Sequence, residues 1–171
     1  MRRARLIFSI LAVVAVTIPV GSGEVSRKPS ASTPAESFLA SRWTQVTAPA
    51  NVDPAVLRAL TGRFGKDKRL AGPGEPFEAT DVESGRPSRR FLLAGCDKGK
   101  WFVAYERGGR GHHVVLAIFD SRATPPTPSL LARGSAGSHD DVVGWRVTID
   151  ELKAAVKTGR LTLIDTHDAS F

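Results

Sequence analysis

The chain has 171 residues, of which 42% are hydrophobic and 24% charged, and its formal net charge is +7 at pH 7. This is the composition of an ordinary globular protein, and the length is sufficient for one domain with its own core. The lone cysteine, Cys96, excludes an intramolecular disulfide.

The first residues have the layout of a secretory signal peptide. Residues 1–5 are basic, and residues 6–20 form an uncharged, almost wholly apolar run of fifteen residues before a Gly-Ser-Gly tract. This run is shorter than the roughly 18–20 apolar residues that span a bilayer comfortably. We therefore expect residues 1–23 to be a signal peptide and the chain to be exported, either to a periplasm or into the medium. Retention of the segment as a membrane anchor is the alternative.

The charge of the exported form limits the choice of partners. Removal of residues 1–23 would take away three arginines and no acidic residue, leaving a net charge of +4 (21 Lys and Arg minus 17 Asp and Glu). Such a charge favours weak attraction to anionic surfaces, such as cell-envelope polymers. It is too small to predict binding to nucleic acid.

Two helices are expected in the N-terminal part of the domain, after a flexible polar leader at residues 24–33. The sequence Thr33-Pro34-Ala35-Glu36 combines a capping threonine, a proline suited to the first turn and the glutamate of a capping box. Asp53-Pro54 repeats the capping signal for a second helix, which Gly62 ends.

The centre of the chain predicts an antiparallel meander. Runs of aliphatic and aromatic residues are separated by the short turns at residues 97–100 and 108–111. Connections this short cannot hold a crossover helix, so neighbouring strands must be antiparallel. Both faces of these runs are largely apolar, which predicts cover on both sides of the sheet. Together with one earlier and one later run, the expected strands are residues 77–82, 88–96, 101–107, 112–119 and 141–147.

The segment at residues 121–140 is rich in proline, glycine and serine, and its prolines argue against a central strand. We expect a long loop there, which would be either a functional flap or disordered. A capping box at Thr148-Ile149-Asp150-Glu151 then predicts a C-terminal helix that ends at Gly159. The predicted fold class is α+β: a meander sheet of four to five strands with two N-terminal helices and one C-terminal helix. These form a single domain at residues 34–165, followed by a polar tail at residues 166–171.

The candidate catalytic residues are His113, His139 and Asp140, which would supply the histidine–carboxylate pair of a small hydrolase. No G-x-S-x-G elbow is present, and a flexible loop positions reacting groups poorly. The alternative is that residues 138–141 are a polar entry to a strand. Neither a metal nor a cofactor is expected, because the neighbours His112 and His113 would point to opposite faces of a strand and no zinc-binding motif occurs.

The candidate ligand-binding residues are Arg107, Arg110 and His112, at the glycine-rich turn of residues 108–111. Backbone N–H groups of such a turn can hold an anion with arginines as charge partners, although an ordinary hairpin turn is the alternative. A second group of arginines, at the opposite turn, is expected to form a solvated basic rim. These arginines are Arg86, Arg89 and Arg90.

The leading functional hypothesis is an exported, non-enzymatic domain that binds a protein or an anionic envelope component. Binding would use the basic hairpin ends and the proline-rich loop. The alternatives are a small hydrolase with a histidine–carboxylate site, or an envelope protein tethered by an uncleaved N-terminus. A histidine within about 3–3.5 Å of a carboxylate in a concave pocket would favour the hydrolase.

Overall fold

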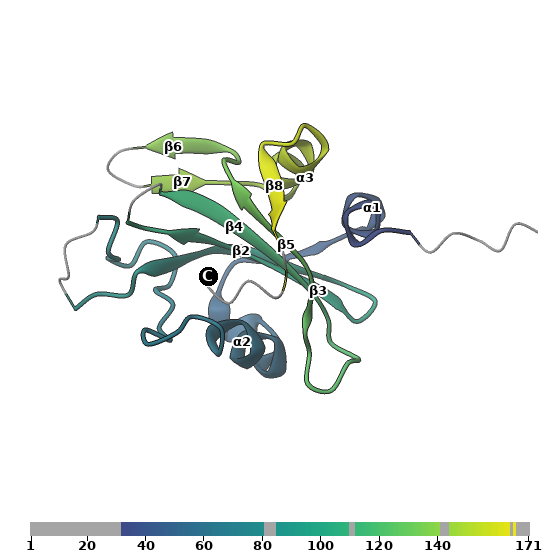
Figure 1. The fold of residues 1–171 in the computed structure, drawn as a ribbon, viewed down its shortest axis with the longest axis horizontal. Helices are drawn as coiled ribbons and strands as arrows, with labels where there is room; N and C mark the ends of the chain where they lie inside the picture. Colours follow the sequence, from purple (N-terminus) through teal and green to yellow (C-terminus); the bar gives the residue numbers. More distant parts are fainter. Residues whose placement is uncertain (1–31, 81–84, 110–111, 141–143, 165, 167–171) are drawn as a thin grey trace, which may run out of the picture. The chain divides into compact units, whose positions relative to one another are not determined.

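The computed structural model describes residues 32–80, 85–109, 112–140, 144–164 and 166. The expected signal peptide lies outside these residues. The described chain has an α+β architecture: a six-stranded antiparallel sheet of order β1-β2-β3-β4-β5-β8 and a two-stranded sheet of β6 and β7 (Figure 1). The helical elements are α1 (Pro34–Ala40), η1 (Pro49–Asn51), α2 (Pro54–Thr61) and α3 (Ile149–Lys157). The strands are β1 (Thr44–Val46), β2 (Arg89–Asp97), β3 (Lys100–Arg107), β4 (His113–Asp120), β5 (Pro128–Gly134), β6 (Ser138–Asp140), β7 (Gly144–Arg146) and β8 (Leu161–Ile164).

The predicted fold class and the central meander are confirmed. Strands β2, β3 and β4 are paired in sequence order, with Asp97 opposite Lys100 at the first turn. Lys98 and Gly99 in that turn have positive φ angles of 49° and 81°, which is the geometry of a tight hairpin whose twist matches the flanking strands. The meander is longer than predicted, because β5 and β8 continue it.

The three predicted helices are also confirmed, together with their caps. Thr33 and Glu36 form a reciprocal capping box at α1, and Thr148 and Glu151 form another at α3. The Asp53 side chain accepts a hydrogen bond from the backbone of the second residue of α2. Each cap satisfies N–H groups that a helix start leaves without partners, so these short helices begin where the sequence indicates.

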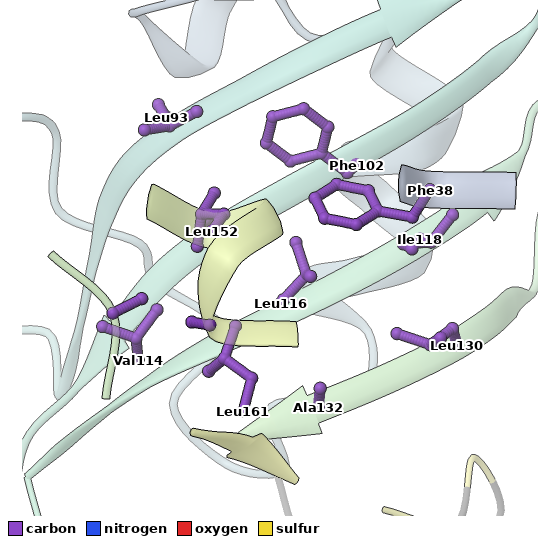
Figure 2. Close-up of a cluster of buried hydrophobic side chains, with 13 residues drawn as sticks. Phe38, Leu93, Phe102, Val114, Leu116, Ile118, Leu130, Ala132, Leu152 and Leu161 are labelled. Atoms are coloured by element: carbon purple, nitrogen blue, oxygen red, sulfur yellow. The ribbon is translucent and has the colours of Figure 1, made fainter. Parts of the chain in front are cut away.

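The sheet is covered on both faces, as its two-sided apolar pattern predicts. Figure 1 shows α1 and α3 on one face and α2 on the other, and we call these the α1/α3 face and the α2 face. On the α1/α3 face, Phe38 of α1 and Leu152 of α3 pack against Phe102 and Leu116 of the sheet (Figure 2). The α2 face is filled by a second cluster, which includes Val56, Leu60, Phe91, Tyr105, Val115 and Phe119. Within the described residues, none of the helices has the length and apolar character needed to cross a bilayer.

The strand expected at residues 77–82 is wrong over its described part. Residues 77–80 form no strand, and residues 81 and 82 lie outside the described chain. The outer edge of β2 is used by two other segments instead. Ala71 forms a bridge to its first residues, with the Ala71 N–H donating to Arg89 O (2.9 Å) and the Phe91 N–H donating to Ala71 O (2.8 Å). Strand β1, which is too short to give a sequence signal, pairs with the other half of β2.

The loop expected at residues 121–140 is wrong from residue 128 onward, where β5 joins the sheet and β6 follows it. Proline is tolerated because Pro128 is the first residue of β5 and lies opposite Phe119 of β4. Strand β8 pairs with β5 only from Leu131 onward, so the missing N–H of Pro128 interrupts no bond to β8. Strand β7 lies within the strand expected at residues 141–147, but it pairs with β6 and not with the meander.

Candidate functional site

A bulge in β2 determines which charged side chains meet. The pairing of β2 with β3 shifts by one residue at Leu92, which has no partner in the ladder. A one-residue slip moves every side chain beyond it to the other face of the sheet. Without the bulge, Arg90 would lie opposite Arg107. With the bulge, Arg90 lies opposite Glu106.

Glu106 is the centre of a buried ionic cluster on the α1/α3 face. Its side chain is 0% exposed, and its Oε2 accepts hydrogen bonds from Arg90 Nε (3.0 Å) and Arg90 Nη2 (2.5 Å). Its other oxygen, Oε1, contacts Nε2 of His112. We call these three residues the Glu106 cluster. A buried carboxylate is tolerated only with such partners, so the cluster fixes the orientation of the Arg90 guanidinium.

The ring of Phe77 completes the surroundings of this cluster. The guanidinium carbon of Arg90 lies 4.5 Å from the ring centroid, and the His112 ring lies 5.9 Å from it. A guanidinium over an aromatic face gains a cation–π attraction and loses access to water on that side. The segment that was expected to extend the sheet therefore holds the guanidinium of a buried arginine.

A hollow of about 250 Å³ lies beside the bulge, between the start of β2, the loop at residues 73 and 74, and β7. It is smaller than the roughly 300–1,000 Å³ of sites for drug-sized ligands. Its wall is mostly apolar, but it includes the buried Arg90 and the exposed Arg146. The lining residues are Pro73, Gly74, Arg90, Phe91, Leu92, Trp145, Arg146 and Val147.

The two arginines of the hollow differ in their burial and in their side-chain contacts. Arg90 is held by Glu106, so it presents a fixed guanidinium whose charge is balanced by the carboxylate. Arg146 is exposed and makes no hydrogen bond or ion pair through its side chain with any residue that the structure describes. Chemically, the hollow offers one anchored and one exposed guanidinium beside an indole and aliphatic groups. That combination suits an anionic group with an apolar neighbour.

A second buried arginine lies on the α2 face at the same end of the sheet. Arg89 is 5% exposed, and its Nη1 donates to Asp67 O (3.3 Å) and Ser88 Oγ (3.0 Å). Its guanidinium carbon lies 4.3 Å from the centroid of the Phe64 ring. Burial lowers the pKa of Arg89, and the neighbouring Arg107 lowers it further.

The expected solvated rim of Arg86, Arg89 and Arg90 is therefore wrong for two of its three members. Arg89 and Arg90 are buried, and only Arg86 is exposed. The reason is that the bridge at Ala71 and the side chains of Phe64 and Phe77 cover the first residues of β2 on their two faces.

The structure brings one of the predicted site residues to a carboxylate. His112 contacts Glu106, whereas Arg107 and His113 lie opposite each other on β3 and β4 and are half-buried. Arg110 lies outside the described residues. The backbones of His139 and Asp140 form part of β6, opposite Trp145 and Gly144, but their side chains are not among those described.

The geometric criterion for a hydrolase was a histidine close to a carboxylate and a concave pocket around that histidine. The first part is met and the second is not. A histidine does contact a carboxylate, but it is His112 and not His113 or His139. Furthermore, His112 is not among the residues that line the hollow. Among the described residues, no group of three or more histidine, cysteine, aspartate or glutamate side chains is placed to hold a metal ion.

Four residues of the site escape prediction from the sequence: Arg90, Glu106, Trp145 and Arg146. The first two have charged side chains near strand ends, which is the normal position of solvated residues. The sequence would indicate the pairing of Arg90 with Glu106 only if the bulge were known, since the bulge brings the two residues opposite each other.

Comparison with known proteins gives no relative for this chain. No family model, no curated protein and no solved structure matches it. The function proposed below therefore depends on the geometry of the site and on the sequence.

Proposed function

We propose that this chain is an exported, non-enzymatic binding domain that recognises an anionic group on a cell-envelope component or a protein. The observation that carries the proposal is the hollow beside the bulge of β2, in which Arg90 and Arg146 meet an apolar wall. The predicted partner class is retained, but the place of binding moves from the hairpin turn at residues 108–111 to this hollow.

The arrangement of charge supports an anionic ligand. Arg90 and Glu106 form a balanced pair, and the exposed Arg146 adds one positive charge at the rim. Because the Arg90 guanidinium is already ordered by Glu106 and Phe77, a ligand that contacts it would not have to order it on binding. The net charge of +4 expected for the exported form adds a general attraction to anionic surfaces.

The experiment is a binding measurement with the full chain on surfaces that carry poly-L-glutamate or the neutral poly-L-glutamine. We expect binding to the anionic polymer alone, weakening as salt rises from 50 to 200 mM, because exposed charges are screened. Arg146→Glu should reduce the binding strongly. Arg133→Glu, which changes an exposed arginine of β5 outside the hollow, should reduce it much less. Absence of binding, or equal losses in the two variants, would contradict the proposal.

Export is the second element of the proposal and is supported by the N-terminal pattern. N-terminal sequencing of the protein recovered from the medium or the periplasm should begin near Glu24. An intact Met1 on membrane-bound protein would instead favour the tethered envelope protein.

A small hydrolase is the second candidate function, and the contact between His112 and Glu106 favours it. We rank it lower because this imidazole does not line the hollow beside the bulge of β2. Turnover of p-nitrophenyl esters by the full chain distinguishes the two functions. Saturable turnover that is lost in His112→Ala but retained in His113→Ala would establish the hydrolase.

A further inference from the structure

The structure assigns a ligand class to the hollow: we propose that it takes a carboxylate carried on a small apolar group. This inference rests on the proposed function and narrows it from any anion to a monoanion with an apolar body. The same chemistry occurs in the C-terminal residue of a peptide and in a short free carboxylic acid.

The charges at the hollow favour a carboxylate. Glu106 pairs with Arg90, whereas the exposed Arg146 has no side-chain hydrogen bond or ion pair to any described residue. Arg146 therefore offers one guanidinium at the rim, which matches a single carboxylate. A phosphate ester carries about −1.5 to −2 charges at pH 7, and inorganic phosphate is a mixture of monoanion and dianion, so the additional negative charge would lie beside the buried Glu106 carboxylate, an arrangement that disfavours binding.

The guanidinium groups of the hollow also fit a carboxylate in shape and hydrogen bonding. Guanidinium groups are planar forks of N–H donors that match the two oxygens of a carboxylate. Arg146 is exposed and has no side-chain hydrogen bond to any described residue, so its donors are available at the rim. The plane of Arg90 is fixed by Glu106 on one edge and by Phe77 on one face.

The remaining wall and the size of the hollow suit a small apolar group. Leu92, Val147, Pro73 and the half-buried Trp145 give most of the lining an apolar character. Burial of an apolar group against them contributes about 25 cal/mol per Å² removed from water. A volume of about 250 Å³ suits a group of the size of an amino-acid side chain and is small for a larger organic ligand.

The experiment is a titration of the full, ¹⁵N-labelled chain followed by amide chemical shifts. The probes are 4-methylpentanoate, its neutral analogue 4-methylpentanamide, inorganic phosphate, and the dipeptide N-acetyl-Ala-Leu with a free carboxylate. We expect 4-methylpentanoate to shift the amides of Leu92, Trp145 and Arg146. We expect the amide and phosphate to bind at least about tenfold more weakly, as the loss of a charge-assisted hydrogen bond implies.

Two variants test the assignment without disturbing the core. Arg146→Gln should weaken the binding of 4-methylpentanoate about fivefold to tenfold, whereas Arg133→Gln should leave it unchanged. Binding of the dipeptide at least as tight as that of the free acid would identify a peptide C-terminus as the source, and binding of the free acid alone would identify a small acid. Equal affinity for acid and amide, tighter binding of phosphate, or shifts confined to other regions would overturn the inference. Binding to poly-L-glutamate that depends on Arg146 would then still leave the proposed function standing.

Discussion

Two neighbouring arginines, Arg89 and Arg90, are buried on opposite faces of the same end of the sheet, and the protein accommodates them differently. On the α1/α3 face, Arg90 is paired with the fully buried carboxylate of Glu106. On the α2 face, Arg89 donates to a carbonyl oxygen and a hydroxyl and lies over the Phe64 ring, while burial lowers its pKa. The Asp67 carboxylate also attracts Arg89. A buried cation can thus be paired directly with a buried carboxylate, or it can donate to a carbonyl oxygen and a hydroxyl while a neighbouring carboxylate attracts it. Mutations at Arg89 and at the partner of Arg90 should therefore change the stability by different amounts.

The largest effect is expected from Glu106→Gln, which removes the charge that balances Arg90. Breaking a buried ion pair by changing one partner costs about 3–5 kcal/mol, because the other charge stays buried without compensation. The free energy of unfolding, measured with urea, should fall by this amount. The matched control is Glu36→Gln, the same chemical change in the exposed capping box of α1, where glutamine also caps. A loss below about 1 kcal/mol in Glu106→Gln would contradict the importance of the pair.

A double variant, Arg90→Met with Glu106→Leu, sharpens this prediction. Replacing both members of a buried ion pair by apolar groups of similar volume is often neutral or stabilising. We expect the double variant to recover part of the stability lost in Glu106→Gln, because the contact between Glu106 and His112 is lost as well. Anion binding in the hollow should be lost. Stability and binding would then be separated in one protein.

Replacement of Arg89, on the α2 face, should lower the free energy of unfolding less than Glu106→Gln does. Arg89→Met removes the hydrogen bonds to Asp67 O and Ser88 Oγ, the attraction by the Asp67 carboxylate and the contact with Phe64, but it also removes a buried charge that Arg107 repels. We expect a loss of about 1–2 kcal/mol in the free energy of unfolding. Arg58→Met on the exposed surface of α2 is the control and should change it by less than about 0.5 kcal/mol. A loss as large as that of Glu106→Gln would show that Arg89 also depends on a single strong partner.

The sequence contains enough information for the meander but not for the contrast between the two arginines. The turn at Lys98 and Gly99 and the apolar runs on either side specify the hairpin of β2 and β3. Counting back from that turn with a regular ladder places Arg90 opposite Arg107, on the wrong face. Only the bulge at Leu92 corrects the register, and no local sequence pattern here indicates a bulge.

The other differences between the predicted and the observed structure also arise from contacts between residues far apart in the sequence. Strand β5 begins with a proline, which local reasoning assigns to a loop, but Pro128 is the first residue of the strand, and the pairing with β8 begins only at Leu131. The hollow brings together residues 73 and 74, the start of β2 and β7, which are far apart in the sequence. Long-range contacts of this kind are set by packing, whereas the helix caps at Thr33, Asp53 and Thr148 are local and were predicted correctly.

The carboxylate of Asp67, whose backbone oxygen accepts from Arg89 on the α2 face, should make the free energy of unfolding depend on pH. Burial raises the pKa of Asp67, but hydrogen bonds from the side chain of Arg69 and from the N–H groups of Ser88 and Arg69 outweigh it, so its pKa is lowered from the ordinary value of 3.8. A carboxyl whose pKa is lower when folded stabilises the fold above its unfolded pKa, and this contribution is lost as the pH falls through the folded pKa.

We therefore expect wild type to be more stable than Asp67→Asn at pH 6, with the difference shrinking as the pH falls below 3.8. The effect should be modest, since the carboxylate is partly exposed to solvent. Urea midpoints at pH 6 and pH 3 measure it. A difference between the two proteins that does not change with pH would contradict this account and point to packing alone.

The smallest effect is expected from Tyr105→Phe, next to Glu106 on β3 but on the other face. The Tyr105 hydroxyl is buried and has no hydrogen-bond partner among the described residues, and burial raises its pKa. A buried polar group without a partner carries a desolvation penalty, so its removal should leave the free energy of unfolding unchanged or raise it by up to about 1 kcal/mol. Urea unfolding measures this. A loss above about 1 kcal/mol would mean that an ordered water bonds the hydroxyl, and that the α2 face too depends on a polar network around its arginine. The contrast between Tyr105→Phe and Glu106→Gln, one residue apart, is therefore the sharpest test of how the two faces differ.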